Sequence, residues 1–263
     1  MSTISYALRD SATMLRRNLR RAVRYPVAAA ASVGVPVVFL LLFVYVLGDT
    51  MGAGLAGVSG GRAEYLDYIT PGILLLAVAG AAQGTAISVA QDMTEGIVAR
   101  FRTMAIARVS VLTGHVVGNL IQTMLAVVVV VGLALLLGFR ATATPLEWIA
   151  AFALLTMVTF AVIWLAVAMG LVSKSVESAS NLPLPLVLLP FLGSGFVPTD
   201  SLPTGLRWFA EYQPFTPIME TLRGLLLGTA IGNSGLLAVA WSAGIALVGY
   251  LWAKHLYNRD PTP

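Results

Sequence analysis

Residues 109–137, VSVLTGHVVGNLIQTMLAVVVVVGLALLL, run for 29 residues without Asp, Glu, Lys or Arg. A helix needs about 20 consecutive apolar residues to cross the hydrocarbon core of a bilayer, so this stretch can span a membrane and project beyond it at one end. Its apolar residues are continuous and do not alternate with polar ones, which favours a helix over a barrel strand. The stretch therefore predicts an all-α integral membrane protein.

Five further uncharged stretches have spanning length: residues 27–47, 68–90, 148–172, 179–197 and 235–253. The first is too long to be the apolar core of a cleavable signal peptide. The chain of 263 residues is 58% hydrophobic and only 11% charged, whereas about 25% of residues in a soluble domain are charged. This composition requires lipid as the outer solvent and excludes a soluble enzyme. We expect residues 1–263 to form a single transmembrane domain with six spans.

The Lys and Arg residues indicate the orientation of the spans. Six spans place both termini on one side, and that side carries twelve of the sixteen Lys and Arg residues. Because cytoplasmic segments hold an excess of basic residues, we expect a multi-pass protein of the cell (plasma or inner) membrane with both termini in the cytoplasm. This topology explains the net charge of +4, so no nucleic-acid partner is expected. Cysteine is absent, which excludes disulfides and thiolate metal sites.

Two segments outside the spans have helical patterns. In residues 3–25, Ile4, Leu8, Leu15 and Leu19 recur at helical spacing, and arginines occupy the other face. This pattern predicts an amphipathic helix in the cytoplasmic interface, which acts either as a basic anchor or as a contact for a partner. Residues 91–108, QDMTEGIVARFRTMAIAR, place acids before bases. That order suits the dipole of a short helix, which would offer a docking site to a cytoplasmic partner. The alternative is a solvated loop.

Residues 198–228 are too apolar for an ordinary loop and too rich in proline to cross the membrane. We expect short extracellular helices here that lie in the outer leaflet or re-enter it. Thr216 can cap a helix that begins at Pro217 and ends at Gly228. Arg223 is expected to lie at the headgroup level or to pair with Glu220 on the same helical face. The segment is either a membrane anchor or a gate.

Two sequence patterns match motifs of soluble enzymes, but they lack the strand and helix that these motifs need on either side. Gly52, Gly54 and Gly57 match a dinucleotide-binding pattern, and residues 57–61 match G-x-S-x-G, but both lie in one short extracellular loop. The nearest approach to a Walker A motif, residues 170–175, lacks the second glycine, so the chain has no P-loop of its own. We expect no catalytic residue, no metal site and no cofactor in this chain.

The spans contain neutral polar residues but no deep carboxylate or lysine. Ion-coupled carriers usually need a buried ionisable group, so such a carrier is disfavoured. The neutral residues are expected to form interhelical hydrogen bonds or to line a substrate path. The candidates for such a path are Gln83, Ser88, Asn119, Gln122, Thr123 and Asn181.

Four blocks of the sequence resemble permease subunits of type-2 ABC exporters, most closely the daunorubicin/doxorubicin-resistance branch. They are residues 68–72, residues 92–102, residues 107–114 and residues 196–228. Together with the six-span layout and the amphipathic leader, they cover most of the chain. The family often has proline where Ala105 stands and arginine where His115 stands, so this chain departs from the pattern at these two positions.

The resemblance implies a half-transporter that moves hydrophobic or amphipathic compounds, such as drugs, lipids or glycolipids, out of the cytoplasm or inner leaflet. Two separate ATPase subunits would bind ATP and Mg, and a second permease subunit, identical or homologous, would complete the complex within membrane lipid. Residues 91–108 would couple to the ATPase through Asp92, Glu95, Gly96, Arg100, Phe101, Arg102 and Arg108. The extracellular gate would contain Pro198, Pro214, Pro217, Glu220 and Arg223. The alternatives are an intramembrane lipid-modifying enzyme and an ion-coupled carrier.

Overall fold

The computed structural model describes residues 16, 26–54, 61–96, 108–196, 199 and 202–258, and within these ranges it contains helices and no strands. Residues 3–25, apart from Arg16, lie outside the described residues, as do Arg100, Phe101, Arg102 and Pro198. The long helices are α2 (Pro26–Leu42), α4 (Arg62–Thr94), α6 (Arg108–Leu136), α7 (Pro145–Val172) and α12 (Ser234–Asn258). A π-helical turn, η1 (Phe43–Leu47), joins α2 to α3 (Gly48–Gly54).

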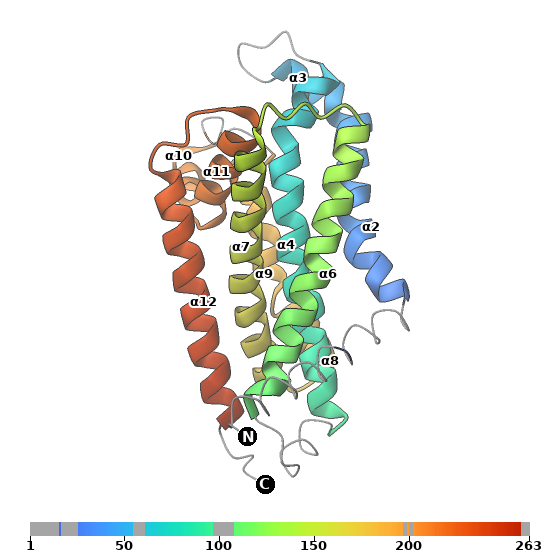
Figure 1. Ribbon diagram of the computed structural model, residues 1–263, viewed down its shortest axis with the longest axis vertical. Helices are drawn as coiled ribbons and strands as arrows, with labels where there is room; N and C mark the ends of the chain where they lie inside the picture. Colours follow the sequence, from blue (N-terminus) through green and yellow to red (C-terminus); the bar gives the residue numbers. More distant parts are fainter. Residues whose placement is uncertain are drawn as a thin grey trace.

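Five of the helical stretches are long and apolar enough to cross a membrane: Ser32–Gly52, Arg62–Thr94, Leu112–Leu136, Pro145–Val172 and Ser234–Asn258. They correspond to five of the six predicted spans and run side by side along the long axis of the molecule (Figure 1). Their outward surfaces are apolar, as shown by Val46, Leu136 and Leu236, which are 70%, 86% and 77% exposed. Because a soluble protein rarely exposes a continuous apolar surface, these faces suit lipid.

The remaining predicted span, residues 179–197, is the fifth in chain order and does not form one continuous helix. Three short elements take its place: α8 (Val176–Asn181), α9 (Leu184–Leu188) and η2 (Leu189–Leu192). Proline has no N–H to donate, and its ring clashes with the preceding turn, so Pro183, Pro185 and Pro190 divide the stretch. The helical run ends at Leu192, and residues 193–196 form turns. The apolar run was predicted correctly, but its single-helix form was wrong.

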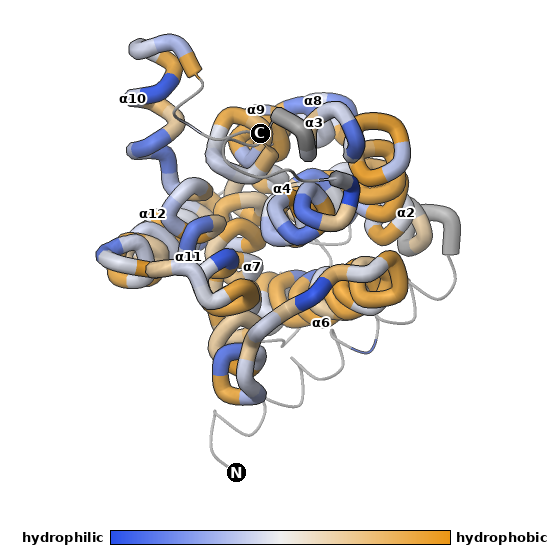
Figure 2. Tube along the Cα trace, turned by 90° about the horizontal axis from the view of Figure 1, so that it is seen from above, coloured by the Kyte–Doolittle hydropathy of each residue, from blue (hydrophilic) through white to orange (hydrophobic). Residues whose placement is uncertain are grey.

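Helix α4 is the centre of the bundle. It contacts α2, α6, α7, α8 and α11 (Phe215–Leu227), and Figure 2 shows it surrounded by its neighbours. All residues from 69 to 79 are buried. The main apolar core joins this part of α4 to α11 through Phe215, Ile218 and Leu222. The outer half of α4 is therefore enclosed by protein on all sides.

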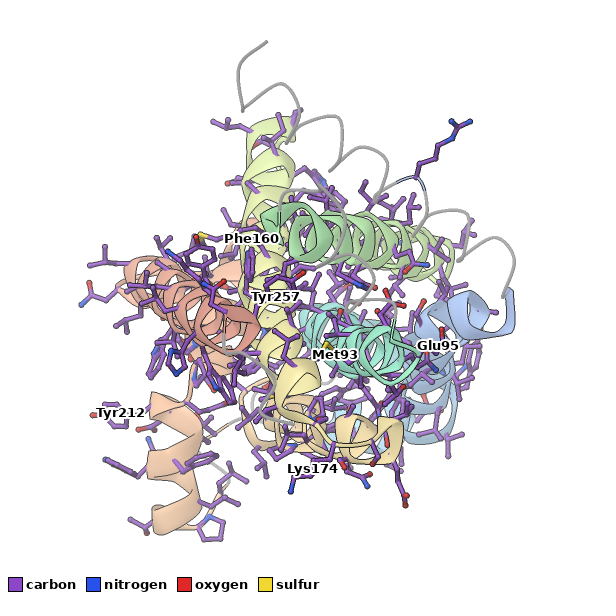
Figure 3. All side chains as sticks on the ribbon, turned by 90° about the horizontal axis from the view of Figure 1, so that it is seen from below. Met93, Glu95, Phe160, Lys174, Tyr212 and Tyr257 are labelled. Atoms are coloured by element: carbon purple, nitrogen blue, oxygen red, sulfur yellow. The ribbon has the colours of Figure 1, made fainter. Side chains whose placement is uncertain are left out.

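Two ends of the bundle are distinct. Helix α3, α11 and the short α10 (Thr204–Tyr212) lie at one end, and the last turns of α4 and α12 lie at the other (Figure 1). Helix α10 lies crosswise to the long helices and stands apart from the bundle (Figures 2 and 3). With the predicted orientation, α10 and α11 are at the extracellular end and Thr94 is at the cytoplasmic end.

Candidate functional site

At the cytoplasmic end, α4 extends beyond its apolar stretch as far as Thr94. Asp92 lies in the last turn, and the N–H of Glu95 donates to the carbonyl of Gln91 at 2.9 Å. Gly96 then has a φ of +68°, a left-handed conformation that glycine adopts without strain and that ends the helix. The expectation that Asp92 and Glu95 begin a helix is therefore wrong, because they lie at the end of one. Glu95 is exposed at this end, together with Met93 and Lys174 (Figure 3).

Asp92 does not share this exposure, because it is buried against His115 of α6. The side chains of Asp92 and His115 are 1% and 4% exposed, and Oδ2 of Asp92 lies 3.0 Å from Nε2 of the imidazole. Oγ of Ser88, one turn before Asp92, lies 3.2 Å from Nδ1 of the same ring. The ring can satisfy both contacts, since Nε2–H donates to the carboxylate and the Ser88 hydroxyl can donate to or accept from Nδ1. Both ring nitrogens are thus bonded to α4.

Sequence reasoning missed His115 as a functional candidate. The available signal was the spacing of Ser88 and Asp92 by four residues on one face of α4, which leaves room for one side chain that bonds to both. The group contains the residue types of a hydrolytic triad, but it lies among helical backbone whose N–H groups are bonded within α4 and α6. Among the described residues, no free N–H pair is available there to stabilise an oxyanion. The arrangement therefore suits the positioning of helices better than catalysis.

Four of the six predicted path residues form side-chain hydrogen bonds, which are of two kinds. Nε2 of Gln83 donates to the carbonyl of Ser180 at 2.9 Å and joins α4 to α8. Asn119 and Thr123 bond to carbonyls within their own helix, at 2.9 and 2.8 Å. The prediction of interhelical bonds therefore holds for Gln83 and Ser88 but is wrong for Asn119 and Thr123.

Two path candidates, Gln122 and Asn181, have side chains without a hydrogen bond among the described residues. They belong to α6 and α8, which lie on opposite sides of α4 (Figure 2). The six candidates therefore do not form one surface within a single chain.

At the extracellular end, Arg223 of α11 is held by backbone carbonyls and an aromatic ring. Its Nη2 lies 2.8 Å from the carbonyl oxygen of Ser194 and 3.4 Å from that of Tyr68. The guanidinium also lies 4.2 Å from the centre of the Tyr68 ring, and Oη of Tyr68 donates to the same Ser194 carbonyl at 3.0 Å. These contacts of Arg223 and Tyr68 join α4, α11 and the turn that follows η2. Burial lowers the pKa of Arg223 below the ordinary value of arginine, and the charge of Glu220 opposes that shift.

The predicted hydrogen-bonded pair of Arg223 with Glu220 does not form. Oε2 of Glu220 instead accepts from Oγ of Ser234 at 2.6 Å, a contact that joins α11 to the start of α12. Two carbonyls and a ring replace the carboxylate as partners of the guanidinium. Sequence spacing identified the nearest acid on the helix, but it could not show that a turn 29 residues earlier would lie closer.

Helix α11 begins at Phe215, two residues before the predicted start at Pro217. Pro214 is at the N-cap, and Pro217 lies in the first turn, where its missing N–H breaks no hydrogen bond. Thr216 does not cap this helix, because its hydroxyl donates to the carbonyl of Ala210. The predicted end at Gly228 is confirmed by a left-handed φ of +72° and a bond from its N–H to Gly224.

Gln213 is a second residue that sequence reasoning missed. Its Nε2 donates to the carbonyl of Leu189 and to Oγ1 of Thr216, both at 3.2 Å, so it joins η2 to α11. Three buried polar atoms in this region have no hydrogen-bond partner among the described residues: Oγ of Ser194, Oε1 of Gln213 and Nε of Arg223. Buried polar atoms are normally bonded, so these three are exceptions among the described residues.

These features define a class of protein. The described residues form a bundle of five apolar helices of spanning length and a divided apolar stretch, residues 176–192. This is the architecture of a multi-pass membrane protein. The family model described as ABC-2 type transporter matches residues 10–227, and the chain belongs to this family.

The chain is similar to named permeases along nearly its whole length. It is 29% identical over 255 residues to the daunorubicin resistance ABC transporter permease protein DrrB1 of Streptomyces coeruleorubidus, with 96% of this chain and 87% of the relative covered. It is 25% identical over 265 residues to the probable doxorubicin resistance ABC transporter permease protein DrrC of Mycobacterium tuberculosis, with 95% and 89% covered. A shorter match, 26% over 172 residues, relates 63% of this chain to 23% of ABC transporter G family member 20 of Dictyostelium discoideum.

Proposed function

We propose that this chain is the transmembrane permease subunit of an ATP-driven exporter of hydrophobic or amphipathic compounds, such as drugs, lipids or glycolipids. Two copies of a separate ATPase bind ATP and Mg, and a second permease subunit, either the same chain or a homologue, completes the complex. The observation that carries this proposal is the family match over residues 10–227. The names of two relatives, which are resistance permeases, support export of such compounds.

The proposed topology has six crossings of the cell membrane and both termini in the cytoplasm. Segments α8, α9 and η2 form the fifth crossing. Their 17 residues would span about 25 Å as a continuous helix, and the turns of residues 193–196 supply the remaining depth of a core about 30 Å thick. The excess of Lys and Arg on the proposed cytoplasmic side supports this orientation.

The ATPase docks on the segment between α4 and α6. Glu95 and Gly96 stand at its start and are accessible at the end of the bundle. Arg100, Phe101, Arg102 and Arg108 supply the remaining contacts, and the amphipathic helix of residues 3–25 lies beside them. Asp92 contributes indirectly, because its carboxylate is buried against His115.

The hairpin of α10 and α11 closes the extracellular exit. Arg223 and Glu220 hold it in the closed state through Ser194, Tyr68 and Ser234, while Pro198, Pro214 and Pro217 shape its turns. The proposed movement of this hairpin is supported by the three buried polar atoms beside it that have no partner among the described residues, since an open arrangement would let them form hydrogen bonds. Gln122 and Asn181 are the path residues whose side chains are free to meet a substrate.

Co-purification and reconstitution test the proposal. The chain is expressed with a candidate ATPase whose sequence contains a Walker A motif, purified through a tag on the permease alone and placed in lipid vesicles. We expect the ATPase to co-purify and a hydrophobic drug to stimulate ATP hydrolysis and move across the vesicle membrane. An ATPase with its catalytic glutamate replaced by glutamine is the control. Movement driven by an ion gradient without the ATPase would support a carrier, and a modified lipid product would support an enzyme.

A further inference from the structure

The contact between Asp92 and His115 is buried, unlike the ion pairs between other described residues. Arg62 pairs with Asp49 and Arg207 pairs with Glu211 on exposed surfaces, whereas Asp92 and His115 are almost fully buried. An apolar cluster that includes Val89, Leu112 and Val116 lies next to them. Replacing a buried ion pair by packed apolar residues is often neutral for stability or stabilising, so stability alone explains this pair poorly.

The geometry gives the pair a specific mechanical effect. Ser88 and Asp92 are one turn apart on α4 and bond to the two ring nitrogens of His115. Apolar contacts between the helices are non-directional and allow them to slide or rotate. Hydrogen bonds at both ends of one rigid ring require a particular distance and angle at each end. The imidazole therefore fixes the axial position and the rotation of α6 relative to α4.

The contact between Asp92 and His115 lies beside the segment that is proposed to couple the permease to the ATPase. Asp92 lies in the last turn of α4 and His115 about two turns inside α6, so together they flank the segment of residues 97–107. Any force applied to that segment reaches the bundle through these two helix ends.

We propose that Ser88, Asp92 and His115 are positioning residues that lock the cytoplasmic ends of α4 and α6 together. The two spans then move as one body when the ATPase displaces the segment between them. This inference rests on the proposed function for its role in transport, but the lock itself is a property of this chain alone.

The test combines a double variant with two measurements. Asp92→Leu with His115→Leu replaces the two facing side chains together, so the variant keeps an apolar contact between α4 and α6 but loses the directional bonds. In vesicles with the ATPase, we expect at least a fivefold decrease in drug molecules moved per ATP hydrolysed, with unchanged co-purification of the ATPase. His115→Gln retains a donor and an acceptor and should preserve most of the coupling. Ser242→Ala removes a buried hydrogen bond within α12 alone and is the matched control.

The second measurement does not depend on transport. Because the chain has no native cysteine, Met93→Cys and Val117→Cys allow spin labels on α4 and α6 and a distance measurement by pulsed electron resonance. We expect one narrow distance distribution in the parent chain, unchanged when ATP is trapped, and a broad one in the double leucine variant. A distribution equally narrow in both would overturn the lock, and so would a parent distance that shifts when ATP is trapped.

The two measurements separate the inference from the proposed function. If the double variant broadens the distance distribution but moves as much drug per ATP as the parent, the role in coupling is wrong and the proposed function stands. If the parent complex itself shows no ATP-dependent transport, the proposed function fails. The distance measurement then still decides whether the lock exists.

Discussion

Single glycines determine how closely the helices approach. A Cβ atom at Gly249 of α12 would lie 2.5 Å from the backbone nitrogen of Leu165, and one at Gly72 of α4 would lie 2.7 Å from the carbonyl oxygen of Gly195. The close approach at Gly249 also brings Trp164 and Tyr250 into edge-to-face contact, with ring centres 5.0 Å apart. These positions need a residue without a side chain because the neighbouring atoms are backbone and cannot move aside.

We predict that Gly249→Val destabilises the chain more than Gly244→Val. Both substitutions lie in α12, but a Cβ atom at Gly244 meets nothing within 4 Å. Overpacking at Gly249 should lower the free energy of unfolding by ~1–3 kcal/mol relative to the matched variant. Thermal unfolding in detergent, followed by tryptophan fluorescence, measures the difference. Equal midpoints for the two variants would contradict close packing of α7 and α12.

At the scale of elements, the long helices could be predicted from the sequence. A continuous apolar run in lipid must satisfy its own backbone hydrogen bonds, and an α-helix does so within one segment. The contacts of Asp92 and Arg223 could not be predicted in the same way. Their partners, His115 and Ser194, are 23 and 29 residues away and are brought near only by the packing of whole helices. The fifth stretch is long enough for one spanning helix, but its prolines at 183, 185 and 190 favour the division into α8, α9 and η2.

The segment between α4 and α6 carries a prediction about coupling. Glu95→Ala and Arg102→Ala should each reduce drug movement per ATP at least severalfold while the chain still inserts into the membrane. The reason is that both replacements remove a charge from the surface proposed to touch the ATPase. Transport by the reconstituted complex and the amount of permease in the membrane are the measurements. Asp49→Asn, an exposed substitution at the opposite end, is the control. Coupling like that of the parent in both variants would refute the docking assignment.

The hairpin of α10 and α11 carries a prediction about opening. Thr221 is 7% exposed, so Thr221→Cys should react slowly with a membrane-impermeant thiol reagent and faster when ATP is trapped. Gly205 is exposed on α10 with nothing within 4 Å of an added Cβ, so Gly205→Cys should react at one rate in both states. The labelling rate of each variant is measured in intact cells. A rate at Thr221→Cys that does not depend on nucleotide would leave the hairpin as an anchor and not a gate.

For the whole molecule, the number of crossings depends on the broken stretch between Lys174 and the hairpin. If α8, α9 and η2 cross the membrane, Lys174→Cys and Gly205→Cys lie on opposite sides. Lys174 and Gly205 are both exposed in the folded chain, so burial does not hide either. We predict that Gly205→Cys is labelled from outside the cell and Lys174→Cys only in inside-out vesicles. Labelling of both from the same side would show that this stretch does not cross and that the chain has five crossings.

The broken fifth stretch also has a consequence for how the protein is made. The regular helix is interrupted in this stretch, so carbonyls near the breaks lose the donors of a continuous helix, and lipid offers none. Carbonyls at the breaks instead accept from side chains of other elements, Ser180 from Gln83 of α4 and Leu189 from Gln213 beside α11. Gln213 leaves the ribosome after the stretch itself. We therefore expect the fifth stretch to complete its hydrogen bonds only after residues up to Gln213 have been synthesised.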